Sequence, residues 1–175
     1  MSRHGPDGLP DDGWRGRRAA RVVLIDAAKR VLLLRASDPS DPSKGVWWEI
    51  PGGGQDPGET SEVAAKRELH EETGITEAEI GPCVWVAHCQ FQFGPYWFDQ
   101  RERVHVAWCG IEETIEPAHL EPLEAMAFSG AKWWSLDELL DSDVATLPAN
   151  LREHLPDLIE GRLPDPPINI GDIDF

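Results

Sequence analysis

Cysteine is scarce in this 175-residue sequence, which holds only Cys83, Cys89 and Cys109. Their number is odd, each lies in a strand-like stretch, and their spacing fits no zinc motif, so we expect reduced cysteines that serve packing. The sequence also lacks an apolar run of about 18 residues, which a membrane helix needs, and a charged leader followed by an apolar segment and a cleavage site. These absences predict a cytoplasmic protein with no membrane partner.

Positive charge is the second shortage. The chain has 16 lysines and arginines against 32 aspartates and glutamates, which gives a formal net charge of −16. Surfaces that bind nucleic-acid polymers are usually basic, so we expect no nucleic-acid polymer as a partner. The overall field would also repel a polyphosphate, so such a substrate must be bound by metal ions and local arginines.

Apolar residues are plentiful: they make up 41% of the chain and include eight tryptophans. This content and the length suit one core of ordinary size, and we find no internal repeat. Residues 1–18 are rich in Gly, Pro, Asp and Arg and predict a flexible N-terminal arm, followed by one domain over residues 19–160. The Pro- and Asp-rich residues 161–175 predict a flexible tail or an arm on a partner subunit.

Short apolar or alternating runs predict strands over residues 19–25, 30–36, 46–50 and 101–109, and residues 78–93 contain a further strand-like run, VWVAHCQFQF. We expect a turn at residues 81–82, a hairpin tip at 94–99, a loop at 112–129, and helices at 136–141 and 149–160, the last kinked or split by Pro156. Strands on both sides of a central helix, with a further helix at the C-terminal end, predict a mixed-sheet sandwich of the α/β class.

That central helix follows a glycine-rich segment. Pro51 ends the strand before it, and Gly52, Gly53 and Gly54 predict a flexible loop. Thr60 is a suitable N-cap, the following residues are good helix formers, and Gly74 is suited to end the helix. The order is therefore strand, glycine loop, helix and stop.

Three glutamates of this helix, Glu68, Glu71 and Glu72, stand at i, i+3 and i+4 and therefore share one face. Like charges at this spacing cost an isolated helix about 0.2–0.5 kcal/mol per pair. One interpretation is a solvated acidic face. The other is a site for Mg²⁺ or Mn²⁺, which prefer clustered carboxylate oxygens, and the adjacent glycine loop and Arg67 favour it.

The segment resembles the Nudix box at every specified position, in the pattern Gly53-x5-Glu59-x7-Arg67-Glu68-Leu69-x-Glu71-Glu72-x-Gly74-Ile75. The resemblance implies the α/β/α Nudix fold with a mixed β-sheet. It also implies an enzyme that hydrolyses a diphosphate linkage of a nucleoside diphosphate derivative with Mg²⁺ or Mn²⁺. A metal ion at such a linkage neutralises its charge and activates a water molecule.

The resemblance also implies residue roles. The implied metal ligands are Glu68 and Glu72, with Glu71 binding directly or through water, Glu59 supporting the site and the Gly53 carbonyl as a further ligand. Arg67 would hold a glutamate in a bidentate pair. The general base in such enzymes is either a box glutamate or an acid on a later loop. Glu124 is our candidate for the latter, with an ordinary loop acid as the alternative.

Candidates for substrate binding are Arg35, Arg101, Arg103, Trp48 and Trp97. Arg35 stands at the end of a predicted strand, where MutT-like members often have an arginine that contacts phosphate. Arg101 and Arg103 share one face of another predicted strand. Trp48, Trp97 or Phe98 would stack on a base. The alternatives are surface charge for the arginines and core or dimer packing for the aromatic residues.

The residues after the box point away from two subfamilies. Gln90 stands where ADP-ribose pyrophosphatases of the family tend to have proline, and Phe91 and Gln92 stand where dinucleoside polyphosphate hydrolases tend to have tyrosine. A MutT-like enzyme for a (d)NTP or a modified nucleotide remains. The alternatives are an ADP-ribose or nucleotide-sugar pyrophosphatase and a non-catalytic ligand-sensing domain, although a sensor would usually lose box glutamates. The chain is expected to be a monomer or a homodimer.

Overall fold

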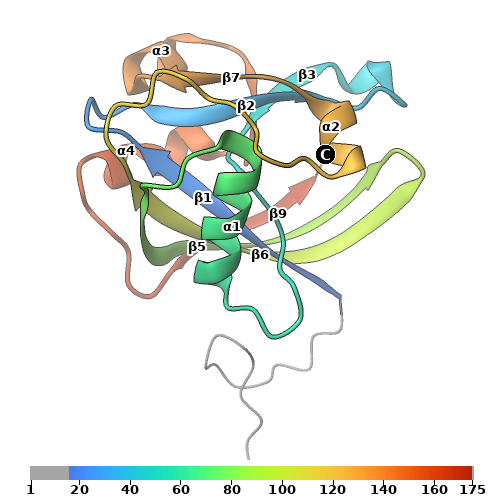
Figure 1. The fold of residues 1–175 in the computed structure, drawn as a ribbon, viewed down its shortest axis with the longest axis horizontal. Coiled ribbons are helices and arrows are strands. Elements are labelled where there is room, and N and C mark those ends of the chain that lie inside the picture. The colour runs from blue at the N-terminus through green and yellow to red at the C-terminus, as the bar shows by residue number, and fades with distance from the viewer. Residues whose placement is uncertain (1–15, 175) are drawn as a thin grey trace, which may run out of the picture.

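The computed structural model describes residues 16–174 and, within them, one mixed sheet with helices on both faces (Figure 1). The strands are β1 (Arg17–Ile25), β2 (Val31–Ser37), β3 (Val46–Glu49), β4 (Gly52–Gly54), β5 (Glu79–Phe93), β6 (Tyr96–Trp108), β7 (Phe128–Trp134), β8 (Ala145–Leu147) and β9 (Ile168–Asp174). The helices are α1 (Ser61–Thr73), α2 (Pro122–Ala127), α3 (Leu136–Asp141) and α4 (Leu151–Ile159), with a 3₁₀ turn, η1 (Pro42–Lys44).

The strand order is β8-β3-β2-β1-β6-β5-β9, with β4 also paired to β1 and β7 to β2. Strand β1 runs parallel to β6 and antiparallel to β2 and β4, while β5 and β6 form a long antiparallel hairpin. Parallel and antiparallel pairs therefore occur in one sheet, as the sequence predicts.

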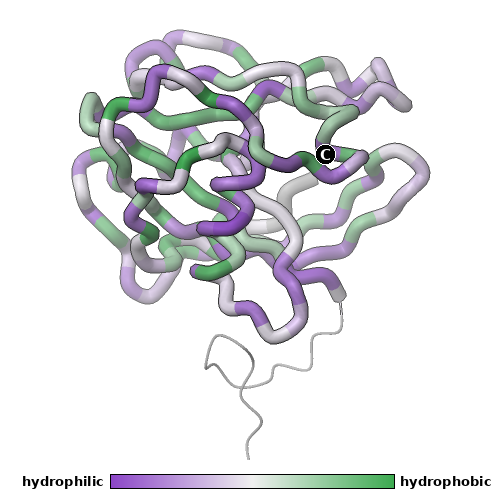
Figure 2. The backbone as a smooth tube through the Cα atoms, in the orientation of Figure 1, coloured by the Kyte–Doolittle hydropathy of each residue, from purple (hydrophilic) through white to green (hydrophobic). Residues whose placement is uncertain are grey.

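Helix α1 covers one face of this sheet. It begins after Thr60, whose side chain accepts a hydrogen bond from the Val63 backbone N–H at 3.2 Å, and ends at Gly74 with φ of 76°. Both ends match the sequence prediction. Ala64, Ala65 and Leu69 are buried against the even-numbered apolar residues of β1. Figure 2 shows that the rest of α1 is mainly hydrophilic, as expected of a helix with one buried side.

Helix α4 covers the other face. Leu151, Leu155 and Leu158 are almost fully buried and belong to one core cluster with Val23, Trp85 and other inward-facing strand residues. Pro156 lies inside α4 without dividing it, so the predicted helix persists as one element. With α1 on one face and α4 on the other, the predicted α/β/α sandwich is confirmed.

Two segments that the sequence predicts as loops contain regular secondary structure. Gly52–Gly54 is not a free loop but the short strand β4, because its backbone pairs with residues 19–21 of β1. The predicted loop at 112–129 contains α2. Pro122 occupies the first turn of that helix, where proline loses no hydrogen bond, and Glu121 and Glu124 form a reciprocal capping box.

The ends of β5 and of the chain also differ. Residues 81–82 lie within β5, at an irregularity in its pairing with β6, and the hairpin turn is shorter than expected because β6 already begins at Tyr96. Part of the expected tail forms β9, which runs parallel to β5 and buries Ile170. At the other end, residue 16 forms a bend and residues 17 and 18 belong to β1, whereas residues 1–15 of the predicted arm lie outside the described residues. Within the described part, no helix is long and apolar enough to cross a membrane.

Candidate active site

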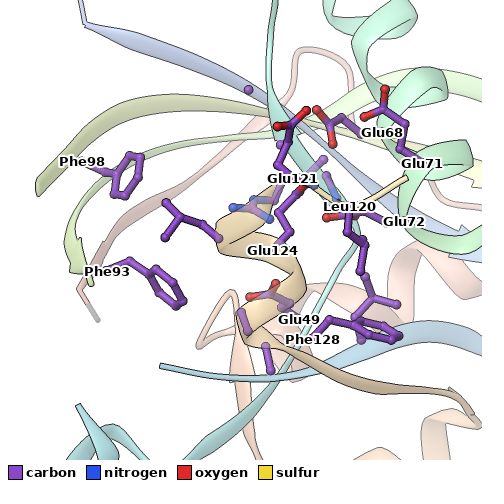
Figure 3. Close-up of a pocket in the computed structure, with 18 of the residues that line it drawn as sticks. Glu49, Glu68, Glu71, Glu72, Phe93, Phe98, Leu120, Glu121, Glu124 and Phe128 are labelled. Atoms are coloured by element: carbon purple, nitrogen blue, oxygen red, sulfur yellow. Dashed lines mark hydrogen bonds between the residues drawn. The ribbon is translucent and has the colours of Figure 1, made fainter. Parts of the chain in front are cut away.

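Three carboxylates from two helices converge at one point. Glu68 and Glu72 come from α1 and Glu124 comes from α2, and one carboxylate oxygen of each lies within 4.8 Å of the others. Glu68 and Glu72 share a face of α1 because they are four residues apart. Figure 3 shows this arrangement, with the α2 glutamates between α1 and the rest of the pocket. The structure thus brings Glu124 to the box glutamates, although it lies 52 positions after Glu72 in the sequence.

The glycines of β4 allow α1 to approach so closely. The Gly52 backbone N–H donates a hydrogen bond to Glu72 Oε2 at 2.8 Å. A Cβ atom on Gly53 would lie only 2.7 Å from the Glu68 carboxylate carbon. Any side chain at position 53 would therefore compete with Glu68 for the same space.

The segment between β6 and α2 is held by the last turn of α1. The backbone N–H groups of Ala118 and His119 both donate to the Glu71 carbonyl at 2.9 Å, and that of Glu116 donates to the Thr73 carbonyl at 3.1 Å. These carbonyls have no partner within the helix, so the loop caps it. The Glu121 backbone N–H then donates to Glu124 Oε1 at 2.8 Å, which orients that carboxylate. Glu124 is therefore tied to the helix that carries Glu68 and Glu72.

Burial and mutual repulsion disfavour the negative charges of these carboxylates. Burial, with the Glu124 charge as the next cause, raises the pKa of Glu72 well above its ordinary value. Burial also raises the pKa of Glu68, although the Arg67 hydrogen bond opposes the shift. Glu68 Oε2 is buried and has no hydrogen-bond partner among the described residues. Clustered oxygen donors with an unpartnered buried carboxylate suit a hard divalent cation such as Mg²⁺ or Mn²⁺, which would offset this repulsion.

Arg67 organises the loop side of the site. It forms a bidentate pair with Glu59, at 2.8 and 3.0 Å. Nη2, which takes part in that pair, also donates to the Gly54 carbonyl at 2.9 Å. The remaining nitrogen, Nη1, donates to Glu68 Oε1 at 2.8 Å and more weakly to Glu71 at 3.3 Å. Glu59 and Glu71 are thus neighbours of Arg67 rather than members of the group formed by Glu68, Glu72 and Glu124. Their direct ligation of metal remains a prediction.

A cavity of about 510 Å³ opens beside these carboxylates. Its charged lining includes Arg17, Arg21, Arg35 and Lys44, and its aromatic lining is Trp47, Phe91, Phe93, Phe98 and Phe128. Figure 3 shows Phe93 and Phe98 across the cavity from the α1 glutamates. Phe91 and Phe98 are stacked, with centroids 4.9 Å apart. One end of the cavity therefore offers carboxylates and the other offers aromatic faces.

Of the predicted substrate-side residues, Arg35 lies in this cavity, where its Nη1 donates to Ser129 Oγ at 3.0 Å. Trp48 does not line it: its ring packs edge-on against Trp134, with centroids 5.2 Å apart. Trp97 is 67% exposed and also lies outside. In both cases the neighbouring aromatic residue, Trp47 or Phe98, lines the cavity, because successive strand side chains point to opposite faces.

Arg101 and Arg103 do not join the carboxylate site either. With Arg18 they line a second cavity of about 460 Å³. They alternate along β6 with Gln100 and Glu102, which are buried on the inner face. The second cavity shares Gln55 with the first, so the two cavities are neighbours.

The sequence reasoning missed a chain of buried polar side chains that links two arginines of the cavity lining, Arg17 and Arg21, through β6. Arg17 Nη1 donates to Gln100 Oε1 at 3.0 Å, Gln100 Nε2 donates to Glu102 Oε1 at 2.6 Å, and Arg21 Nε donates to the same oxygen at 2.8 Å. Glu49 also lines the cavity, and burial raises its pKa despite the nearby Arg21 charge. A signal was present, since Arg21 interrupts an apolar run in the strand at residues 19–25.

The protein is thus a sandwich of the α/β/α class that carries a candidate metal site, a carboxylate cluster beside a glycine strand. Residues 15–158 match the NUDIX domain family. This chain therefore belongs to the Nudix family, as the box indicates.

Several curated relatives are similar to it. RNA pyrophosphohydrolase from Caulobacter vibrioides (strain NA1000 / CB15N) is 35% identical over 129 residues, which cover 67% of this chain and 70% of that protein. Nudix hydrolase 26, chloroplastic, from Arabidopsis thaliana is 38% identical over 102 residues, which cover 57% of this chain but only 41% of the plant protein. A putative 8-oxo-dGTP diphosphatase of Bacillus subtilis is 38% identical over 61 residues, 35% of this chain and 36% of that protein.

Solved structures agree on the fold. The dihydroneopterin triphosphate pyrophosphohydrolase of E. coli superposes with a TM-score of 0.58 at 18% identity, covering 82% of this chain and 95% of that one. A MutT protein from Methanosarcina mazei Go1 superposes with a TM-score of 0.56 at 20% identity, covering 83% of this chain and 94% of that one. At these identities the likeness establishes the shared fold.

Proposed function

We propose that this chain hydrolyses a diphosphate linkage in a nucleoside diphosphate derivative, with a (d)NTP or a modified nucleotide as substrate. The observation that carries the proposal is the convergence of Glu68, Glu72 and Glu124 beside a cavity that is aromatic at its other end. Such a cavity can hold a phosphate chain at the carboxylates and stack a base on an aromatic face.

The carboxylates would hold one or more divalent cations, with Glu71, Glu59 and the Gly53 carbonyl as further candidates. A bound cation would neutralise the charge of the phosphate oxygens and lower the pKa of a water molecule. Arg67 holds Glu68 and Glu59 in place through hydrogen bonds to their carboxylates, so we assign it as a positioning residue.

Glu124 is our candidate for the general base. One of its oxygens is fixed by the Glu121 backbone N–H, which leaves the other for a water molecule in the cavity. Its charge raises the pKa of Glu72, so the two carboxylates share one electrostatic environment. In this position Glu124 would accept the proton of the attacking water. The alternative role for Glu124 is to bind the metal.

The test is phosphate and pyrophosphate release from a panel of nucleotides, with Mg²⁺ and Mn²⁺ in parallel. The panel holds dNTPs, NTPs, 8-oxo-dGTP, ADP-ribose, dinucleoside polyphosphates and nucleotide sugars. We expect one or a few nucleotides to be hydrolysed, with activity abolished in Glu72→Gln. Glu62→Gln, an exposed acid on the same helix, is the matched control and should retain full activity. Full turnover by Glu72→Gln would refute the metal-site assignment, and a silent wild-type enzyme that still binds metal would favour a ligand sensor.

A second candidate substrate is the 5′-triphosphate end of RNA. Two observations favour it: the similarity to the Caulobacter enzyme, and the neighbouring cavity lined by Arg18, Arg101 and Arg103. Arginines beside the active site would meet the phosphates that follow the first nucleotide. The net charge of −16 argues against it. Comparing a short 5′-triphosphorylated RNA with the matching free NTP, in wild type and Arg103→Gln, separates the two: a preference for RNA that is lost in the variant would favour the second substrate.

A further inference from the structure

An arginine outside the family motif lies on the floor of the cavity. Arg21 is in the middle of β1, on the inner face that it shares with Val23 and Ile25 of the core. Its register partner on β6 is the apolar Val104, and the polar residues before it in the same face are Gln100 and Glu102, which are 0% and 5% exposed. An ionised side chain among apolar residues is costly to bury unless it is paired, so its position needs a reason.

Its position is fixed from two sides. The Nε–H group donates to Glu102 Oε1 at 2.8 Å, and Gln100 Nε2 holds the same oxygen at 2.6 Å. The aliphatic part of the side chain crosses Gly52, since a Cβ atom there would lie 2.8 Å from Arg21 Cγ. Gly52 is also the residue whose N–H binds Glu72. The arginine is therefore held against β4, the strand whose Gly52 N–H binds the Glu72 carboxylate.

The rest of the guanidinium faces the cavity. Glu102 is the hydrogen-bond partner that the described residues provide for this side chain, and it engages only Nε. Arg21 lines the cavity, its side chain is 17% exposed, and its terminal nitrogens are not among the buried unpartnered atoms. A purely structural ion pair would direct the terminal nitrogens to the carboxylate, in the bidentate form that arginine prefers. Here Glu102 holds Nε, and the two terminal nitrogens face solvent in the cavity.

We propose that Arg21 binds a phosphate oxygen of the substrate through its terminal N–H groups, and that Gln100 and Glu102 are positioning residues that fix its orientation. The inference rests on the proposed function, because it assigns a phosphate ligand within the same site. The proposal predicts that the diphosphate lies between two groups. One is the set of α1 carboxylates with their cation, and the other is the Arg21 guanidinium on β1. Guanidinium groups suit this role because their planar donors match phosphate oxygens.

The test measures ligand binding apart from turnover. Calorimetry with inorganic pyrophosphate in Mg²⁺ would compare wild type, Arg21→Gln, Glu102→Gln and the double variant, with Mn²⁺ binding and thermal unfolding measured on each. The double variant matters because Arg21→Gln alone leaves a buried carboxylate unpaired and could fail to fold. Arg30→Gln is the matched control, since it removes an arginine from another ion pair, with Asp26 at 2.7 Å, outside the cavity.

We expect pyrophosphate affinity to fall about 10- to 100-fold in Arg21→Gln and in the double variant, as for the loss of a charge-assisted hydrogen bond. Mn²⁺ affinity should stay within about twofold of wild type, and Arg30→Gln should lower only thermal stability. Glu102→Gln should weaken pyrophosphate binding less than the Arg21 variants, because the arginine is then present but poorly oriented. Unchanged pyrophosphate affinity in the double variant would overturn the inference, and so would a wild-type protein that does not bind pyrophosphate.

The two proposals fail differently. A wild-type protein that hydrolyses nothing in the nucleotide panel, yet binds pyrophosphate in an Arg21-dependent way, refutes the proposed hydrolase and leaves the phosphate-binding role intact. A hydrolase whose KM and kcat are the same in the double variant refutes the role of Arg21 alone.

Discussion

Gly53→Ala is the substitution that tests the geometry of the carboxylate site most directly. A Cβ atom at position 53 would lie 2.7 Å from the Glu68 carboxylate carbon and from Oε2, and 2.8 Å from Oε1. Ordinary van der Waals contact begins at 3.4 Å, so the carboxylate must move by about 0.7 Å, the difference between 3.4 and 2.7 Å. The backbone of Gly53 does not have a positive φ, so alanine adds no backbone strain.

The expected effect is therefore on activity rather than on folding. A misplacement of about 1 Å in a catalytic site can cost about 100-fold in rate, so we expect kcat/KM to fall by about 10- to 100-fold. The affinity for Mn²⁺ should fall with it, since Glu68 is a proposed ligand. The free energy of unfolding should change little, because the atoms that must move are the end of a flexible side chain. Alanine also lowers the conformational entropy of the unfolded chain, which stabilises the folded state by up to about 1 kcal/mol.

The assay is steady-state hydrolysis of the best substrate, with Mn²⁺ titration and thermal unfolding of the same preparations. Gly110→Ala is the matched control: a Cβ atom there meets nothing within 4 Å, and activity should be unchanged. Wild-type kcat/KM in Gly53→Ala, with normal folding, would refute the reasoning, because Glu68 would then not be required in the position that the structure gives it.

Three further predictions concern the pocket and stability. Phe98→Ala should raise KM for nucleotides more than it lowers kcat, since base stacking contributes about 1–3 kcal/mol per base, and steady-state kinetics would show it. Leu155→Ala, at a fully buried site of α4, should lower the free energy of unfolding by about 2–5 kcal/mol in urea titration. Burial alone would raise the pKa of Asp38, but hydrogen bonds from Ser40 and Lys44 outweigh it and hold the pKa far below its ordinary value. Asp38 therefore stabilises the fold fully above the unfolded pKa of about 4, and this contribution is lost as the pH falls below that value, so the stability difference from Asp38→Asn should shrink on acidification.

Local signals in the sequence determined the central helix and its chemistry. Thr60 and Gly74 specify the two ends of α1 through interactions within a few residues, so the helix could be predicted without the fold. The spacing of Glu68 and Glu72 places them on one face of any helix that contains them. The Nudix resemblance, confirmed by the family match, rests on this segment.

Strand residues next to one another were harder to assign. The pairs Trp47–Trp48 and Trp97–Phe98 each place one ring toward the cavity and the other away from it. A shift of one residue reverses the faces, and the sequence pattern does not say which face meets the cavity. Arg101 and Arg103 were predicted to share a face, and they do, but that face belongs to the second cavity.

The sequence by itself determined the acid-bearing helix, the fold class and the family of this protein, because capping, spacing and alternation act over short distances. Only the tertiary structure decided what surrounds that helix. Glu124 reaches the box glutamates because a loop of β6–α2 caps α1, and Arg21 reaches the cavity floor because Gln100 and Glu102 on a neighbouring strand hold it. Contacts between residues so far apart in the chain depend on how the sheet closes, which no local pattern specifies.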